Sequence, residues 1–243
     1  MAKIASVLGK ESDAKEFESL ANEIRAAFQK RFVGNDGCLV ETSQTAALLA
    51  LEFGLDVRNN DNFLKQLTDN IQAHGCRLST GFIGTPFLLS VLSRFGRTDL
   101  ADRLLLQQEF PSWLYPVLQG ATTIWERWDG YTKEHGILPQ PMNSFNHYAY
   151  GAAASYLYNS IGGIQLADDA IGFKRFVIAP HFPDALDWAE TEFDSPYGTI
   201  RTAWRKENGT VTIKVTVPPN TSAILRLPGQ ADRLLKSGDY CFK

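Results

Sequence analysis

Residues 211–217 read Val-Thr-Ile-Lys-Val-Thr-Val, an unbroken alternation of apolar and polar side chains. A period of two is typical of a β-strand with one buried face. Shorter runs of similar character lie nearby, at residues 176–179, 200–205 and 223–227. The turn-forming pairs Asn208-Gly209 and Pro218-Pro219 flank the alternating stretch. Closely spaced strands with such turns predict a small antiparallel β-sandwich.

Upstream of these strands the sequence changes to a helical period. The first segment carries apolar residues on one helical face, at Phe17, Leu20, Ala21, Ile24 and Phe28. Further helices are predicted at residues 43–53, 60–75, 85–96, 98–108 and 144–158. Six helices with short connections would form three hairpins. We therefore expect an α+β multidomain chain, with helical hairpins in residues 1–168 and the β-sandwich in residues 169–243.

Composition excludes several classes of protein. Hydrophobic residues make up 44% of the 243 residues and charged residues 21%, which is typical of a folded chain. A net charge of −3 gives no electrostatic basis for binding nucleic acid or anionic lipid. No apolar run is long enough to span a membrane, and residues 1–17 lack a signal-peptide pattern. We expect neither a nucleic-acid nor a membrane partner, and the location stays open between cytoplasm and export.

The cysteines and histidines give no pattern typical of a metal site. Cys38, Cys76 and Cys241 are scattered along the chain, without the spacing of a zinc knuckle or a disulfide framework. The glycine-rich loop at residues 79–86 lacks the Lys-Ser/Thr pair of a phosphate-binding loop. We therefore expect no metal and no cofactor.

The densest candidate for chemistry is the segment of residues 121–130, where Glu126 stands between Trp125 and Trp128. A carboxylate among rings that exclude water is either catalytic or firmly paired. In the structural interpretation, Glu126 pairs with a neighbouring arginine and the tryptophans belong to the core. The spacing alone favours this structural interpretation.

A second candidate is the segment of residues 143–150. On the predicted helix, Asn143, Asn146, His147 and Tyr150 would share one face. Amide, imidazole and phenol groups together suit sugar hydroxyls, which both donate and accept hydrogen bonds. The alternative is that Asn143 caps the helix and His147 is an ordinary buried histidine.

Taken in order, several segments together resemble the C-terminal region of bacterial α-L-rhamnosidases. They are residues 80–86, 111–113, 120–130, 142–150, 176–180, 194–198 and 217–221. The resemblance covers nearly the whole chain. It implies part of an (α/α)6 barrel followed by a β-sandwich, and an enzyme that releases terminal L-rhamnose from rhamnosides with inversion of configuration.

The resemblance also implies roles for individual residues. Glu126 matches the general base of the family and His147 matches a histidine that contacts rhamnose. Four further residues are expected to bind or border the sugar: Trp125, Trp128, Phe82 and Asn146. With this resemblance, the functional interpretations of Glu126 and His147 are favoured over the structural ones.

The family's general acid has no counterpart in this sequence. It lies in an acidic motif of the first half of the barrel, whereas Asp13, Asp61 and Asp69 fall on or beside amphipathic helices. We therefore expect the chain to need the missing N-terminal half of the barrel as its partner, and to be inactive alone. The alternatives are another α/α-barrel glycosidase, or a non-catalytic carbohydrate-binding or structural remnant.

Overall fold

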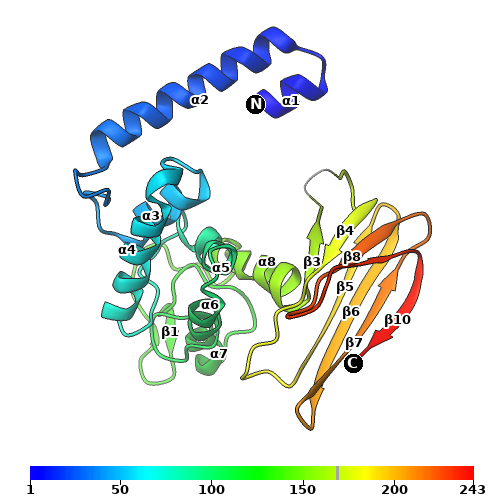
Figure 1. Cartoon of the computed structure of the whole chain (residues 1–243). Helices are drawn as coiled ribbons and strands as arrows, with labels where there is room; N and C mark the ends of the chain where they lie inside the picture. Colours follow the sequence, from blue (N-terminus) through cyan, green and yellow to red (C-terminus); the bar gives the residue numbers. More distant parts are fainter. Residues whose placement is uncertain (168–169) are drawn as a thin grey trace. The chain divides into compact units, whose positions relative to one another are not determined.

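A computed structural model describes residues 1–167 and 170–243 of the chain. The chain folds into two units, Met1–Tyr150 and Gly151–Lys243 (Figure 1). The boundary expected between residues 168 and 169 lies outside the described residues. Each unit has its own core and is described by itself below.

The first unit consists of helices that pack against their neighbours in the chain. The pairs are α1 (Ala2–Val7) with α2 (Glu11–Phe32), α3 (Gln44–Glu52) with α4 (Asn60–Ala73), and α5 (Thr85–Arg94) with α6 (Thr98–Leu105). The short 3₁₀ turn η1 (Val57–Asn59) precedes α4. A short helix α7 (Leu114–Gln119) and a two-stranded hairpin, β1 (Tyr131–Thr132) with β2 (Gly136–Ile137), follow. The predicted helical hairpins are therefore present.

Local chemistry explains where these helices begin and what they bury. The hydroxyl of Ser43 accepts a hydrogen bond from the backbone N–H of Ala46, which satisfies a free donor at the start of α3. The inner faces of the helices supply a core of side chains with no exposed area, including Leu48, Phe63, Leu67, Ile71, Leu88 and Leu92. Burying each such side chain contributes about 1.5–3 kcal/mol. This core supports the loops that follow.

The prediction of a helix at residues 144–158 is wrong for residues 144–148. Residues 141–148 are irregular, and helical structure begins only with the 3₁₀ turn η2 (Ala149–Ala153). The backbone of this segment is bonded elsewhere: Ser144 O accepts from Glu126 N at 2.9 Å, and His147 N donates to Ile124 O at 2.8 Å. Backbone groups used in this way are not available for helical bonds. The shared helical face of Asn143, Asn146, His147 and Tyr150 therefore does not exist.

The second unit is built of two four-stranded sheets (Figure 1). It begins with one turn of α-helix, α8 (Ala154–Tyr156), and a π-helical turn, η3 (Leu157–Ile161). One sheet has the order β10-β7-β6-β5 and is antiparallel throughout; its strands are β5 (Trp188–Ser195), β6 (Gly198–Glu207), β7 (Thr210–Val217) and β10 (Gly238–Phe242).

The other sheet has the order β3-β4-β8-β9, with β3 (Ile164–Leu166), β4 (Arg175–Ile178), β8 (Ser222–Leu225) and β9 (Arg233–Leu235). Its central pair, β4 and β8, is parallel, a detail that the sequence did not predict. Both sheets bury one face, with Phe176, Ile178, Ile200, Trp204, Ile213 and Val215 in the core. The indole N–H of Trp204 donates to Ile161 O at 2.8 Å, so the polar atom of this large side chain is satisfied.

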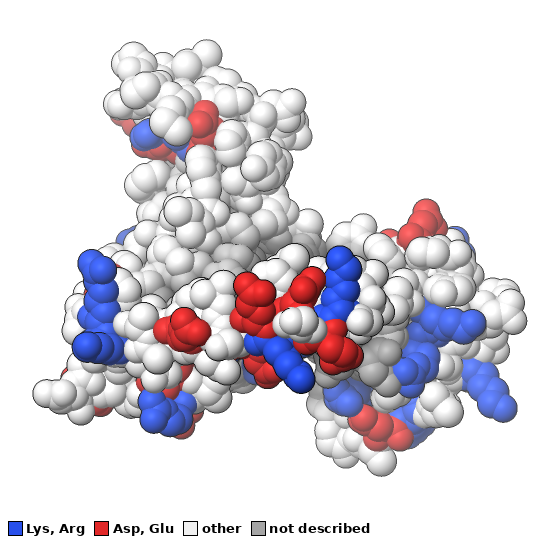
Figure 2. Space-filling model, turned by 90° about the horizontal axis from the view of Figure 1, so that it is seen from above, with Lys and Arg blue, Asp and Glu red and all other residues white. Residues whose placement is uncertain are grey.

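The expected fold class is confirmed: helical hairpins are followed by a module of largely antiparallel sheets. None of the helices in the described ranges is both long and apolar enough to cross a membrane. Acidic and basic side chains are interspersed on the face shown in Figure 2.

Candidate functional site

The loop before α5, which carries Phe82, is held by polar contacts at both of its ends. Gln44 is fully buried, and its side-chain oxygen accepts a hydrogen bond of 2.8 Å from the backbone N–H of Ser79. The hydroxyls of Thr80 and Thr85 are also buried and lie 2.8 Å apart. The predicted start of α5 is correct, but the hydroxyl of Thr85 bonds within the loop and does not cap the helix. Phe82, between these anchors, is half-buried.

Glu126 is positioned by a short pairing of two backbone segments. The backbone N–H of Glu126 donates to Ser144 O at 2.9 Å, and the backbone N–H of Ser144 donates to Glu126 Oε2 at 2.9 Å. Close by, His147 N donates to Ile124 O at 2.8 Å. The carboxylate is half-buried. Among the described residues, the bond from Ser144 is the one hydrogen bond that this carboxylate accepts. Its other oxygen, Oε1, is therefore free to bond a water molecule or a ligand.

His147 belongs to a stack of aromatic rings, between Phe82 and the exposed Tyr148. Its ring stacks on Phe82, with 4.7 Å between centroids and 16° between planes. Phe82 in turn contacts Tyr150 at 5.0 Å, and Tyr150 stacks on Trp128 at 3.9 Å and 18°. The stack therefore brings together three of the predicted site residues, Phe82, His147 and Trp128. Tyr150, which links them, was predicted only as part of a helical stripe.

The tautomer of the His147 ring follows from its hydrogen bond. Its Nδ1 accepts a bond of 3.3 Å from the backbone N–H of Ala149. In the neutral ring the proton is then on Nε2, which can donate to an oxygen acceptor. The ring is half-buried, so a ligand can reach this donor.

Trp125 and Asn146 lie outside the stack. Trp125 is buried and meets Tyr131 and Phe145 edge to face, at 6.3 and 5.1 Å. With Trp128 it lines a cavity of about 40 Å³, which is enough for about one water molecule and too small for a sugar. Asn146 is exposed, and its backbone N–H donates to Ser144 Oγ at 3.2 Å.

The proposed pairing of Glu126 with a neighbouring arginine is not observed. Arg127 instead makes two hydrogen bonds of 3.2 Å to the carboxylate of Asp129. Burial raises the pKa of the Tyr150 phenol; Arg127 lowers this pKa and Glu126 raises it further. Because both charges act on the phenol, Glu126 and Arg127 lie in the electrostatic environment of the ring stack.

Asn143 has a structural role that the predicted helical face did not indicate. Its side-chain N–H groups donate to Gly130 O at 2.9 Å and to Leu138 O at 3.2 Å. A Cβ atom added to Gly130 would lie 2.2 Å from the side-chain oxygen of Asn143, so a larger residue there would displace the Asn143 side chain. Asn143 therefore fixes the ends of the β1–β2 hairpin. Among the described residues, no group of three or more His, Cys, Asp or Glu side chains is placed to hold a metal ion.

Comparison with protein-family models gives two matches that together cover almost the whole chain. Residues 1–161 match the bacterial alpha-L-rhamnosidase 6 hairpin glycosidase domain. Residues 163–241 match the bacterial alpha-L-rhamnosidase C-terminal domain.

Curated relatives are similar over most of this chain. An alpha-L-rhamnosidase of Formosa agariphila is 41% identical over 237 residues, which are 97% of this chain and 25% of the relative. An alpha-L-rhamnosidase of Streptomyces avermitilis is 41% identical over 231 residues, which are 93% of this chain and 22% of the relative. The chain thus spans about a quarter of the length of the curated relatives it matches.

Two solved structures are similar over the full chain. The crystal structure of Streptomyces avermitilis alpha-L-rhamnosidase complexed with L-rhamnose matches with a TM-score of 0.91 and 36% identity, covering 100% of this chain and 25% of that one. The native enzyme from Aspergillus terreus matches with a TM-score of 0.93 and 34% identity, covering 99% of this chain and 28% of that one.

Proposed function

Because the chain belongs to the bacterial α-L-rhamnosidase family, we propose that it supplies the C-terminal part of an enzyme that hydrolyses terminal α-L-rhamnose from rhamnosides. The observation that carries this proposal is the position of Glu126. Its carboxylate is oriented by the backbone N–H of Ser144, and its charge acts on Tyr150 in the stack that contains His147.

In the proposed reaction Glu126 is the general base of an inverting hydrolysis. Oε1 of Glu126 takes a proton from a water molecule, and the water oxygen attacks the anomeric carbon from the face opposite the aglycone. A general acid protonates the glycosidic oxygen as its bond to the anomeric carbon breaks. The products are β-L-rhamnose and the free aglycone alcohol. The two carboxyl groups of such a site stand roughly 6.5–9.5 Å apart.

The surrounding residues would bind and orient the sugar. Rhamnose has an apolar methyl group and C–H faces that suit the half-buried rings of Phe82 and Trp128. The Nε2–H of His147 would donate to a sugar hydroxyl, and the exposed amide of Asn146 can reach other hydroxyls. Trp125, which is buried and lines the same small cavity as Trp128, would act by supporting the wall of the site.

We place the general acid in the N-terminal half of the catalytic barrel, outside this chain. The hairpin of α1 and α2 has an apolar surface to which another part of the enzyme could bind. Its exposed apolar side chains are Ile4, Val7, Leu8, Leu20 and Ile24. Exposed apolar side chains gathered on one hairpin typically mark a contact surface. The isolated chain is therefore proposed to be inactive, with the N-terminal half as its partner.

The decisive experiment is an assay of the intact enzyme followed by proton NMR. Inverting cleavage of a rhamnoside must produce β-L-rhamnose first, before mutarotation. A panel of aryl glycosides tests the alternative that another sugar is the substrate. Preference for a glucoside, or release of α-L-rhamnose first, would contradict the proposal.

A further inference from the structure

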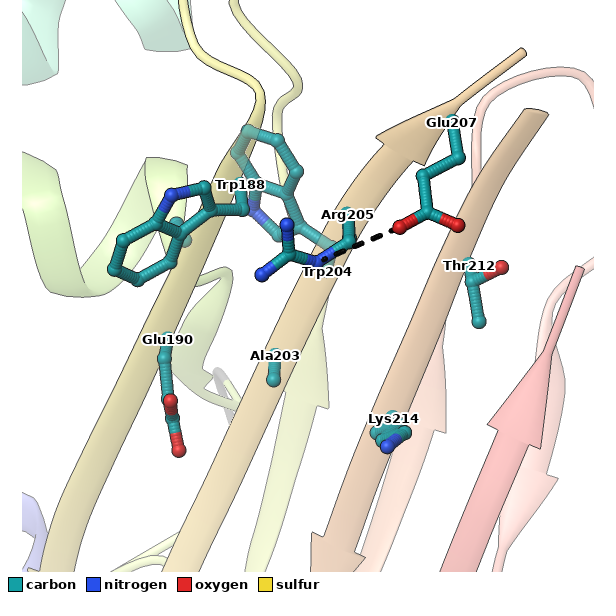
Figure 3. Close-up of a pocket in the computed structure, with 9 residues that line it drawn as sticks. Trp188, Glu190, Ala203, Trp204, Arg205, Glu207, Thr212 and Lys214 are labelled. Atoms are coloured by element: carbon teal, nitrogen blue, oxygen red, sulfur yellow. Dashed lines mark ion pairs between the residues drawn. The ribbon is translucent and has the colours of Figure 1, made fainter. Parts of the chain in front are cut away.

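The outer face of the β10-β7-β6-β5 sheet contains a depression that has no part in the proposed hydrolysis. Its volume is about 360 Å³, within the range of small-molecule sites. Figure 3 shows the residues that form it, which come from three neighbouring strands. The side chains used below are Trp188, Glu190, Ala203, Arg205 and Lys214.

The register of the strands creates this depression. Trp188 pairs with Arg205 across β5 and β6, Glu190 pairs with Ala203, and Ala203 pairs with Lys214 of β7. Paired residues point to the same face of a sheet, so these five side chains all face outward. Ala203 is the shortest of them and lies in the middle. It forms a low floor between longer side chains.

One wall of the depression is an exposed indole. Trp188 has 56% of its surface accessible to solvent, although tryptophan is usually well buried. The guanidinium of Arg205 lies 6.0 Å from the ring centroid, and Arg205 Nε lies 3.9 Å from the carboxylate of Glu207. In Figure 3 the indole of Trp188 and the carboxylate of Glu207 lie on opposite sides of Arg205. A flat apolar surface is thus available at the edge of a polar depression.

The charged groups around the floor indicate the kind of ligand. Among the residues that the structure describes, neither Glu190 nor Lys214 has an ion-pair partner within 4 Å, so both can bond a ligand. Glu190 and Glu207 balance Arg205 and Lys214, which leaves the lining without net charge. A neutral ligand with hydroxyl groups fits this balance better than an anion, because hydroxyls accept from an ammonium and donate to a carboxylate.

We propose that this depression binds a neutral pyranose ring of a glycan. The apolar C–H face of the sugar packs on Trp188 above Ala203, Glu190 accepts hydrogen bonds from its hydroxyls, and Lys214 donates to them. The residues of this site belong to the second unit, whereas Glu126 belongs to the first. It would hold a glycan without cleaving it, and it does not depend on the proposed hydrolysis.

The indole N–H resonance of Trp188 gives a direct test on the full 243-residue chain. Methyl α-L-rhamnopyranoside, methyl α-D-glucopyranoside and D-glucuronate are titrated separately, and the tryptophan signals are followed by nitrogen–proton NMR. A saturable shift of the Trp188 signal with either neutral glycoside supports the proposal. A shift with glucuronate alone shows that the site selects anions, and no shift with any sugar shows that it binds no monosaccharide; both results overturn the proposal.

Three variants separate binding from folding. Ala203→Leu fills the floor of the depression and leaves its walls in place, whereas Trp188→Ala removes the indole. Each variant should weaken binding of the neutral glycoside at least tenfold. Binding is followed on the resonances of the sugar itself. Tyr197→Ala is the matched control, because Tyr197 is another exposed ring with a cation, Lys174, at 5.6 Å. The buried indole signal of Trp204 reports that the core is intact. Unchanged affinity in Ala203→Leu would contradict the assignment.

Discussion

Glu126 and Ser144 are joined by reciprocal hydrogen bonds: each backbone N–H donates to the other residue, one to a carbonyl oxygen and one to carboxylate Oε2, both at 2.9 Å. A carboxylate held in this way keeps its direction without an arginine partner. Since Arg127 is bonded to Asp129, the charge of Glu126 is available for chemistry. This relationship underlies the first prediction.

Glu126→Gln in the intact enzyme should lower kcat by roughly 10²–10⁴-fold, because an amide accepts the Ser144 bond but cannot take a proton from water. KM should change much less, since the shape of the site is kept. Steady-state kinetics on a rhamnoside measures both. Asp129→Asn is the control, because it breaks the neighbouring ion pair without touching the base. Near-normal kcat in Glu126→Gln would rule this residue out as the base.

His147→Ala should lower kcat/KM by about 10–100-fold, because it removes the hydrogen bond that we propose to the substrate, and a bond to a partly charged acceptor contributes about 1.5–3 kcal/mol. The loss should appear partly in KM, unlike that of Glu126→Gln. Tyr148→Ala is the matched control: Tyr148 stacks on the same ring at 5.4 Å but is 88% exposed. Equal losses in the two variants would mean that stacking, and not the imidazole donor, is what matters.

Gln44→Ala should destabilise the chain by about 1–3 kcal/mol, because the backbone N–H of Ser79 and the carbonyl of Arg77 both lose the partner that the buried Gln44 side chain provides. Urea unfolding measures the change. In the intact enzyme kcat/KM should also fall, because the loop that carries Phe82 loses its anchor. Gln72→Ala removes an exposed amide of the same unit and should cost less than about 1 kcal/mol. A stability change no greater than in this control would show that Gln44 does not anchor the loop.

The elements that were predicted correctly are those whose side-chain pattern repeats over a short stretch of sequence. The alternation in β7 and the apolar faces of α3, α4 and α5 are local patterns, and all were predicted. Strand β5 was missed, because its outward side chains are mostly acidic and Phe193 is the one large apolar residue on its inner side. What makes it a strand is its pairing with β6 along its whole length, which is a long-range interaction.

Long-range interactions also limited what could be predicted about the candidate site. Aromatic and acidic residues close together in the sequence indicated Glu126 and His147, but a helix was predicted where Ser144 and His147 in fact bond to residues about 20 positions away. No spacing rule indicates that Tyr150 would contact Phe82 and stack on Trp128, because these rings come from three separate segments. The identities of several site residues could be predicted, whereas their arrangement could not.

The last prediction concerns the chain by itself. Purified alone, it should hydrolyse a natural rhamnoside no faster than buffer, because we place the general acid outside this chain and inverting hydrolysis needs both carboxyl groups. An aryl rhamnoside with an activated leaving group needs little acid, so traces of turnover on such a substrate are compatible with this prediction. Adding the N-terminal part of the enzyme should restore activity. Robust turnover of a natural rhamnoside by the chain alone, lost in Glu126→Gln, would show that the acid is in this chain.

The apolar surface of α2 gives this prediction a second readout. If Leu20 and Ile24 mark the contact with the N-terminal part, the isolated chain should self-associate through them, and Leu20→Glu with Ile24→Glu should make it monomeric in analytical ultracentrifugation. Lys15→Glu, on the opposite face of the same helix, adds negative charge without removing apolar surface. The double variant should also fail to regain activity with the N-terminal part, whereas Lys15→Glu should regain it. Full recovery by the double variant would show that the two parts meet elsewhere.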